Sequence, residues 1–459
     1  MRILPIMAAL FIAGALTVFA DMRDAWYTEG NNAHTTRIEI TLVNTLDIER
    51  TDCPITIPRE TLPIRDIHEM AVTVVDPSLP ARPMPPDSVL KWQGGHNIRE
   101  ETNGQQLFYQ CDDLNKDGVW DELFFITNLK PHERKKMYLY IGFNQRGWNP
   151  HTTHGAIGSY CHHLIPVWES EHVGWKLWYA ETCDVYGKRE PQLMSTELYM
   201  KNRNGYGVDY DDGSDIMRVA NTFGGGAICL FEHAAYPDSV SRPRFAPYEG
   251  ERTSNNNWNE GPLSDTRYAY DVIVNGPLRS IIRAKTMKWD SGNGTYNLEQ
   301  YYTAYTRQNY STCTVKYDTF LPLNAETSFG CGIRKNAMEF DNYVSDNVAM
   351  SFGKDELTDP DDDLRTRMTI VDFVGCAIAV KDEYKPEYRY VAGFGGNHTI
   401  NVPVTDDKTY EYMLFAAWSE GKVYNTPETF KEYVLKSVRE YNNPVKVEVG
   451  GVDKKTASR

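Results

Sequence analysis

Three residues able to move protons or carry positive charge lie within four positions, at Tyr186-Gly187-Lys188-Arg189. A tyrosine hydroxyl can give or take a proton, and two neighbouring cations can stabilise negative charge that develops on a bound molecule. Gly187 would let the backbone bend between them. His233, in an expected strand, is a second candidate base. The simpler alternatives are a solvated surface turn for the first segment and a structural role for the histidine.

A pair of glutamates offers a different chemistry. Glu169 and Glu171 are two residues apart, so on a strand they share a face. They could act as general acid and base, since glycoside hydrolysis needs two carboxylates about 5–10 Å apart, or they could be surface charges. The histidines nearby, His162-His163 and His172, form no HExxH motif and no helical pair, so we do not expect a zinc site.

An acidic loop has the spacing of a calcium site. Oxygen-bearing side chains occupy loop positions 1, 3, 5 and 9, namely Asp113, Asn115, Asp117 and Asp121. A hard cation needs six or more oxygens, and the Val119 carbonyl would supply the ligand at position 7, after the sharp turn that Gly118 permits. Position 12 is Phe124 and not the glutamate of a full EF-hand. We therefore expect a structural calcium loop within a β-hairpin, with an acidic turn that binds no ion as the alternative.

The N-terminus has the pattern of a secretory signal peptide. Arg2 precedes an uncharged apolar stretch, and Val18 and Ala20 stand at the −3 and −1 positions of a cleavage site before Asp21. Cleavage would remove residues 1–20 and place the protein in the periplasm or outside the cell. An uncleaved anchor is the alternative, but the stretch is short for a membrane span, and no other segment approaches that length.

Charge and cysteine content exclude other classes. The net charge is −15 and no run of lysine or arginine offsets it, so the chain would repel nucleic-acid phosphates. The eight cysteines are scattered without a CxxC motif, and no local signature marks one of them as catalytic. An oxidising compartment would permit one or two disulfides, but the spacing does not name a pair.

The elements that must position these residues are mostly strands. Apolar and polar residues alternate along much of the chain, as at Ile38, Ile40 and Leu42, and frequent turn residues separate the runs. This pattern favours β-sandwiches over α/β layers. One helix is expected over 427–440, where Thr426 is placed as N-cap and four apolar residues share a face: Phe430, Tyr433, Val434 and Val438.

The same pattern suggests two domains. We expect a small N-terminal β-sandwich at residues 21–149, which holds the acidic loop, and a large β-sandwich of the supersandwich type at residues 161–444. The large sandwich would carry the activity. Residues 450–459 are expected to be a flexible tail.

Five segments together form a recognisable pattern of order and spacing: Trp168 to Glu171, Asp184 to Arg189, Asp215 to Ala220, Gly224 to Gly226 and the Asp113 loop. Over most of the mature chain they resemble a secreted bacterial family catalogued as domain of unknown function 4861. Members of that family tend to be encoded beside polysaccharide lyases and unsaturated-uronyl hydrolases. One is similar to an oligosaccharide dehydratase that removes water from a uronic acid during ulvan breakdown. The family usually has Tyr-Arg where this chain has Trp175-Lys176, and Lys near Arg218, which leaves the substrate open.

The resemblance implies a lyase or dehydratase that acts by β-elimination on oligosaccharides containing uronic acid. In that hypothesis Arg189 pairs with the uronate carboxylate, Lys188 offsets the developing charge, and Tyr186 or His233 handles the proton. One alternative is a non-catalytic protein that binds carbohydrate, and another is a glycoside hydrolase that uses Glu169. The ten tryptophans and 29 tyrosines permit stacking on sugar rings, although protein cores use the same residues.

Overall fold

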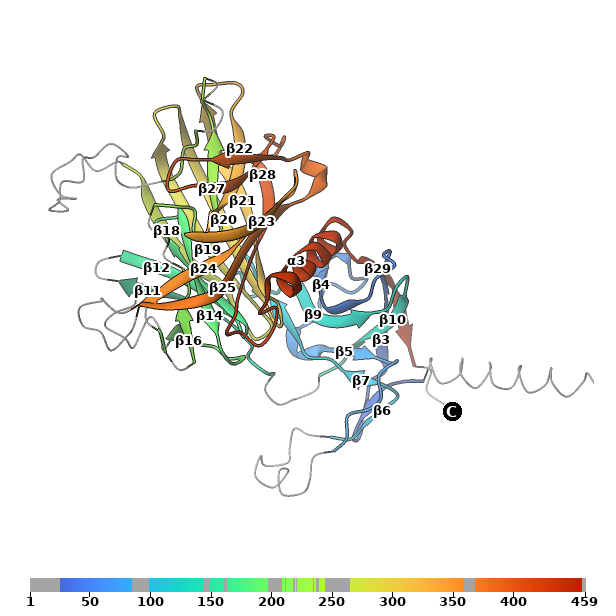
Figure 1. Cartoon of the computed structure of the whole chain (residues 1–459). Helices are drawn as coiled ribbons and strands as arrows, with labels where there is room; N and C mark the ends of the chain where they lie inside the picture. The colour runs from blue at the N-terminus through green and yellow to red at the C-terminus, as the bar shows by residue number, and fades with distance from the viewer. Residues whose placement is uncertain are drawn as a thin grey trace, which may run out of the picture. The chain divides into compact units, whose positions relative to one another are not determined.

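The computed structural model describes residues 25–84, 99–143, 149–160, 163–196, 209–210, 212–217, 219, 221–233, 235–236, 239–243, 265–358 and 368–455. The expected signal peptide at residues 1–20 lies outside these ranges. As predicted, the described chain is mainly β, with one α-helix near its C-terminal end (Figure 1). It separates into two units, Met1–Pro150 with Asn443–Arg459, and His151–Asn442.

The first unit contains short and long strands and two single-turn 3₁₀ helices: β1 (Thr28–Glu29), β2 (Asn32–Ala33), β3 (Thr36–Val43), β4 (Arg50–Pro58), η1 (Arg59–Thr61), η2 (Glu69–Ala71), β5 (Val72–Asp76), β6 (Glu101–Thr102), β7 (Gln105–Gln106), β8 (Tyr109–Asp112), β9 (Glu122–Leu129), β10 (Arg134–Ile141) and β29 (Lys446–Lys454). A five-stranded sheet, β29-β3-β10-β5-β7, and a three-stranded sheet, β4-β9-β8, enclose its core. Alternate apolar residues of both sheets, such as Ile40, Ile55 and Leu139, meet there, as the period-two pattern requires.

The C-terminal segment returns to this first unit. Strand β29 pairs antiparallel with β3, so that Val447 lies opposite Leu42 and Lys454 opposite Thr36. Residues 450–454 are therefore part of a strand, where the sequence suggested a flexible tail. The polar and glycine-rich composition of this segment does not predict a strand. The reason is that a largely exposed edge strand shows little alternation of apolar and polar residues.

The second unit contains the remaining elements: β11 (Thr153–Tyr160), β12 (His163–Ser170), β13 (Val173–Trp178), β14 (Thr182–Lys188), β15 (Asp209–Tyr210), β16 (Gly213–Asp215), β17 (Ala227–Phe231), β18 (Arg267–Asn275), β19 (Arg279–Asp290), β20 (Gly294–Tyr305), β21 (Tyr310–Pro322), β22 (Ser328–Arg334), β23 (Met338–Val344), β24 (Val348–Thr358), β25 (Met368–Val380), η4 (Asp382–Tyr384), β26 (Glu387–Val391), β27 (Asn397–Val402), β28 (Thr409–Trp418) and α3 (Pro427–Asn442). Its largest sheet has eight strands in the order β18-β19-β20-β21-β28-β25-β24-β23. A six-stranded sheet, β11-β12-β13-β14-β16-β15, and a four-stranded sheet, β17-β22-β27-β26, accompany it.

The two smaller sheets cover the same face of the eight-stranded sheet. One hydrophobic cluster joins Trp168 of the six-stranded sheet, Ile400 of the four-stranded sheet and Leu414 of β28. On β28 the next side chain, Phe415, points the other way and packs against Phe430 of α3. Strand β28 is buried on both faces, which makes it the centre of the large sandwich.

Helix α3 matches the expected helix closely. It begins at Pro427 as predicted, and it ends at Asn442, two residues beyond the predicted end. The four residues expected on its apolar face are all buried: Phe430, Tyr433, Val434 and Val438. The Thr429 amide donates to Oγ1 of Thr426 over 3.3 Å, which is the expected N-cap contact.

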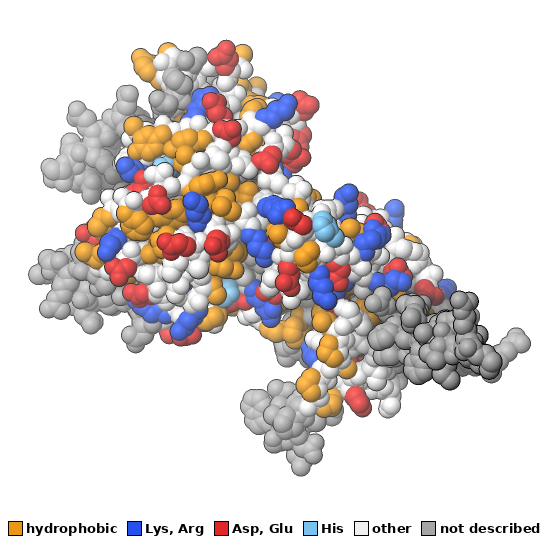
Figure 2. All heavy atoms as spheres, turned by 45° about the vertical axis from the view of Figure 1, so that its right-hand side comes forward, with side chains coloured by type: hydrophobic (Ala, Val, Ile, Leu, Met, Phe, Trp, Pro, Cys, Tyr) orange, Lys and Arg blue, Asp and Glu red, His pale blue; other side chains and the backbone are white. Residues whose placement is uncertain are grey.

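The molecular surface mixes both signs of charge. Figure 2 shows acidic and basic side chains interspersed across the visible face, with no large area of a single sign. None of the helices in the described ranges is both long and apolar enough to span a membrane.

Candidate functional site

The two faces of the six-stranded sheet differ sharply in chemistry. Trp168, Trp175 and Val185 point into the core against the eight-stranded sheet. Because side chains alternate along a strand, the residues between them point away from that core. We call this the outer face and define it by its polar side chains together with Trp178: His154 of β11, Glu169 of β12, Lys176 and Trp178 of β13, and Asp184, Tyr186 and Lys188 of β14.

Lys176 is the centre of one cluster on the outer face. Its Nζ lies 2.7 Å from Oδ2 of Asp184 and donates to the hydroxyl of Tyr186 over 2.8 Å. Trp178 Nε1 donates to the same Asp184 oxygen over 2.5 Å. The Lys176 ammonium also lies 4.8 Å from the ring centre of Trp178 and 5.2 Å from that of Tyr186. Lys176 is 1% exposed and Tyr186 3%, so these contacts form away from water.

This geometry gives Tyr186 the surroundings of a proton-transfer group. An ammonium that donates to a phenol oxygen stabilises negative charge on that oxygen, and burial strengthens the effect. Asp184 balances the lysine charge, so the cluster as a whole does not hold an unpaired cation. Asp215 of β16 lies directly opposite Tyr186 in the strand register and adds a second buried carboxylate to the neighbourhood.

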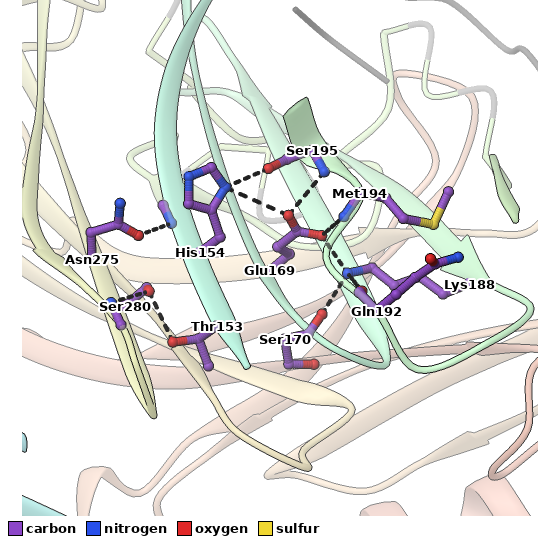
Figure 3. Close-up of polar contacts among 12 residues, drawn as sticks. Thr153, His154, Glu169, Ser170, Lys188, Gln192, Met194, Ser195, Asn275 and Ser280 are labelled. Carbon is purple, nitrogen blue, oxygen red and sulfur yellow. Dashed lines mark hydrogen bonds and ion pairs between the residues drawn. The ribbon is translucent and has the colours of Figure 1, made fainter. Parts of the chain in front are cut away.

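Glu169 is the centre of a second cluster, drawn in Figure 3. Its carboxylate pairs with the ammonium of Lys188 and accepts the backbone N–H groups of Met194 and Ser195, both over 2.9 Å. His154 reaches it from β11, with Nδ1 3.6 Å from Glu169 Oε1 and 2.7 Å from Ser195 Oγ. The segment around Met194 is thereby held over this end of the outer face.

The second cluster has the character of a buried brace. Burial alone would raise the pKa of Glu169, but Lys188, His154 and the backbone donors outweigh it and lower that pKa to about 2. Lys188 also donates to the carbonyls of Ser170, over 2.5 Å, and Gln192, over 2.7 Å. Its three N–H donors are thus all used within the chain. Burial lowers the pKa of Lys188 against the opposing effect of Glu169, although three acceptors around one ammonium favour its charged form.

Comparison with known proteins identifies the family. The family model described as "Domain of unknown function (DUF4861)" matches residues 42–447. The chain belongs to this family. None of the curated proteins searched matches it.

Solved structures give a weaker likeness. An alpha-mannosidase from Enterococcus faecalis V583 is 9% identical, with a TM-score of 0.43, over 92% of this chain and 46% of the mannosidase. A protein in the glycosyl hydrolase family 38 from Enterococcus faecalis is also 9% identical, with a TM-score of 0.41, over 92% of this chain and 48% of its own. This chain therefore spans less than half the length of either structure.

In this member of the family, the segment Tyr186 to Arg189 is no surface turn. Tyr186 and Lys188 lie in strand β14 and are almost fully buried. Gly187 has an ordinary strand conformation, so the bend expected of it is absent. Gly187 instead allows the strand to pack closely against Trp418, because a Cβ at this position would stand 2.5 Å from the indole ring. Gly187 and Lys188 line a small pocket together with Trp418.

The other predicted residues lie apart from Tyr186. Arg189 pairs with Glu420 and lies over the ring of Trp418, 5.0 Å from its centre. His233 follows β17 of the four-stranded sheet, and its Nε2 lies 3.4 Å from Nδ2 of Asn293. Among the described residues, no contact joins His233 to the outer face.

Sequence reasoning gave no role to Asp184 or His154, and it noted Lys176 only as a departure from the family pattern. Asp184 carried a usable signal, because it stands two positions before Tyr186 and so shares its face of a strand. Lys176 and His154 come from other strands, and only the sheet register brings them close.

The acidic loop holds its shape through its own backbone. Asp113 accepts the Gly118 amide over 2.8 Å, Asp117 accepts the Val119 amide over 2.8 Å, and Asp121 accepts the Leu114 amide over 2.8 Å. The carboxylates thus serve as acceptors for the loop's own backbone N–H groups. In the described part of the chain, no group of three or more His, Cys, Asp or Glu side chains is arranged to hold a metal ion. Calcium at this loop therefore stays a prediction.

Proposed function

We propose that the protein is a carbohydrate-active enzyme that performs β-elimination on oligosaccharides containing uronic acid, as a lyase or dehydratase. The observation that carries the proposal is the hydrogen bond from the Lys176 ammonium to the Tyr186 hydroxyl, beside the buried carboxylate of Asp184. Elimination next to a carboxylate needs a strong base close to the acidic carbon. A phenolate that an ammonium stabilises can serve as that base.

The proposed step uses Tyr186 twice. As a phenolate, Tyr186 takes the proton from the carbon beside the uronate carboxylate, and Lys176 stabilises the phenolate before transfer. The electron pair of the broken C–H bond forms the new double bond, and the bond from carbon four to its oxygen breaks. The phenol produced in this way can then return its proton to the departing oxygen.

The uronate carboxylate needs its own partner during this step. Arg189 is the cation predicted for that role, but in this structure it lies apart from Tyr186, paired with Glu420 and against the ring of Trp418. A bidentate guanidinium is suited to a carboxylate, so Arg189 would meet the uronate only if its side chain leaves Glu420 when substrate binds. The role first considered for Lys188, stabilising the developing charge, does not fit its geometry, because Glu169, Ser170 and Gln192 occupy its donors. Lys176 takes that role in the proposal.

Burial sets a condition on substrate entry. Tyr186 and Lys176 are 3% and 1% exposed, so binding has to uncover this part of the outer face. The proposal therefore predicts that residues covering Tyr186 move aside when substrate binds, and a change in backbone hydrogen exchange around strand β14 would report that movement.

A hydrolase based on Glu169 is disfavoured by the same structure. A general acid must be protonated near neutral pH, whereas the pKa of Glu169 is lowered to about 2. Both of its oxygens also accept backbone N–H groups. Glu169 is thus a supporting residue in this proposal, and it positions the end of β14 through Lys188.

Incubation with uronate oligosaccharides separates the possible functions. Elimination creates a double bond conjugated to the carboxylate, which absorbs in the ultraviolet. Loss of one water from an intact oligosaccharide marks a dehydratase, and two fragments with that absorbance mark a lyase. New reducing ends without absorbance would indicate a hydrolase and overturn the proposal, and binding without any product would indicate a carbohydrate-binding protein.

A further inference from the structure

Three titratable side chains on other strands form a continuous hydrogen-bonded chain. The Tyr388 hydroxyl lies 2.9 Å from Nδ1 of His398, and Nε2 of His398 lies 2.9 Å from Oε2 of Glu339. Tyr388 is on β26, the edge strand of the four-stranded sheet, and Glu339 is on β23, the edge strand of the eight-stranded sheet. This hydrogen-bonded chain of side chains thus connects the edge strands of two sheets. None of its three residues belongs to the outer face.

Exposure increases from one end of this chain to the other. The side chains of Glu339 and His398 are 7% and 4% exposed, whereas Tyr388 is partly exposed. Tyr390, the neighbour on the same face of β26, is 40% exposed, and its ring stands edge-on to His398 at a centroid distance of 5.6 Å. A buried carboxylate is therefore linked through an imidazole to a partly exposed phenol.

The contacts of Glu339 fix which nitrogen of His398 carries a proton. Ser351 Oγ donates to Glu339 over 2.6 Å, and Asn342 Nδ2 donates over 3.2 Å. The described residues give Glu339 no lysine or arginine partner, so Nε2 of His398 faces its carboxylate as a hydrogen-bond donor. This favours a proton on Nε2 and leaves Nδ1 to accept the Tyr388 hydroxyl. Burial, and then the charge of Glu339, raises the pKa of Tyr388, which keeps the phenol protonated at rest.

The surroundings indicate the chemistry of a ligand. A phenol oxygen with free lone pairs can accept a hydroxyl, and an exposed aromatic ring beside it can pack against the C–H face of a sugar. Arg389 lies between the two tyrosines in sequence, but it pairs with Glu387 and its guanidinium lies 5.3 Å from the ring centre of Phe231. With the Glu339 carboxylate behind the site and Arg389 engaged elsewhere, an uncharged sugar fits better than a uronate.

We propose that Tyr388, His398 and Glu339 form a second carbohydrate site, which binds a neutral sugar through Tyr388 and Tyr390. A sugar hydroxyl donates to the Tyr388 oxygen, and the Tyr388 hydroxyl keeps its hydrogen bond to Nδ1 of His398. This site is independent of the proposed elimination at Tyr186, because it uses different sheets and a different class of sugar.

Nuclear magnetic resonance of ring-labelled histidine tests the site directly. The resonances of His398 are assigned with His398→Asn, and their nitrogen shifts report the tautomer. We expect the proton on Nε2 at neutral pH. D-Galactose and D-xylose serve as neutral probes and D-glucuronate as the charged probe, and we expect the neutral sugars to shift the His398 signals more strongly. A proton on Nδ1, or an unchanged His398 spectrum with every sugar, would overturn the proposal.

Two variants separate binding from a purely structural role. Tyr388→Phe removes the hydroxyl and should weaken the neutral-sugar response by about tenfold or more. Tyr301→Phe is the matched control, because its hydroxyl also donates a hydrogen bond within the protein, to Glu299, away from the proposed site. Should Tyr388→Phe fail to fold, Tyr390→Ala alters an exposed side chain and should also weaken the response. Sugar-induced shifts that persist in these variants at Tyr388 or Tyr390 would refute the site.

Discussion

Replacing Lys188 with methionine should unfold the large unit at a much lower temperature. The substitution keeps the length of the side chain but removes the ammonium that pairs with Glu169. The carboxylate would stay buried, because the Met194 and Ser195 amides still hold it. The carbonyls of Ser170 and Gln192 would lose their donor at the same time.

Two independent arguments give the same size of effect. Breaking a buried ion pair by removal of one partner costs about 3–5 kcal/mol. The lowering of the Glu169 pKa from 4.5 to about 2 is the net effect of burial, Lys188, His154 and the backbone donors, and it corresponds to roughly 3 kcal/mol in favour of the ionised form. For a unit of this size, a loss of 3–5 kcal/mol lowers the melting temperature by roughly 6–15 °C.

The effect should depend on pH in a defined direction. The folded pKa of Glu169 lies below its unfolded value, so its contribution is present above about pH 4.5 and is lost as pH falls towards 2. Without Lys188, the pKa of Glu169 would rise and the carboxyl would be protonated at a higher pH. The difference in stability between the wild type and Lys188→Met should therefore be largest near neutral pH and shrink on acidification.

Thermal unfolding followed by circular dichroism between neutral and acid pH measures this effect. Lys422→Met is the matched control, since Lys422 pairs with Glu190 at 2.7 Å but is 55% exposed, and its loss should cost less than about 1 kcal/mol. Adding Glu169→Gln to Lys188→Met removes the unpaired charge and should restore part of the stability. A Lys188→Met protein that melts like the wild type at neutral pH would refute the stabilising role of the buried Lys188–Glu169 pair.

Three further predictions concern other parts of the chain. Calcium should raise the melting temperature by mass action and a chelator should lower it, and Asp117→Ala should abolish that response; identical curves would reject the calcium loop. Protein exported by its native host should begin at Asp21, and N-terminal sequencing that finds Met1 would contradict the signal peptide. Gly187→Ala should destabilise the large unit by about 1–3 kcal/mol, because its Cβ would meet the Trp418 ring at 2.5 Å; denaturant unfolding with an unchanged midpoint would contradict this.

Local patterns were enough to predict the fold class and the helix. Alternation at Ile38, Ile40 and Leu42 predicts a strand with one buried face, and the structure has β3 there. Thr426 and Pro427 mark the start of the helix because capping is a local interaction. Strand β29 escaped prediction, since its partner β3 lies some four hundred residues earlier in the sequence.

The candidate site could be predicted only in part. Tyr186 and Lys188 stood out because the resemblance drew attention to their segment, yet the sequence did not show that both face away from the core. That direction depends on which residues of β14 enter the sandwich, and Cys183 and Val185 do so. Lys176 gains its importance from pairing between β13 and β14, where it lies opposite Asp184. Such contacts depend on strand register, which a single sequence does not specify.

The turnover of a uronate oligosaccharide by Tyr186→Phe tests the central claim most directly. The substitution removes one hydroxyl and leaves the ring, and the ultraviolet absorbance of the conjugated product measures elimination by the variant and the wild type. We predict that kcat falls by at least about 10²-fold, whereas Tyr301→Phe retains the wild-type rate. Elimination by a folded Tyr186→Phe protein at the wild-type rate would contradict the proposed role of the Lys176–Tyr186 pair.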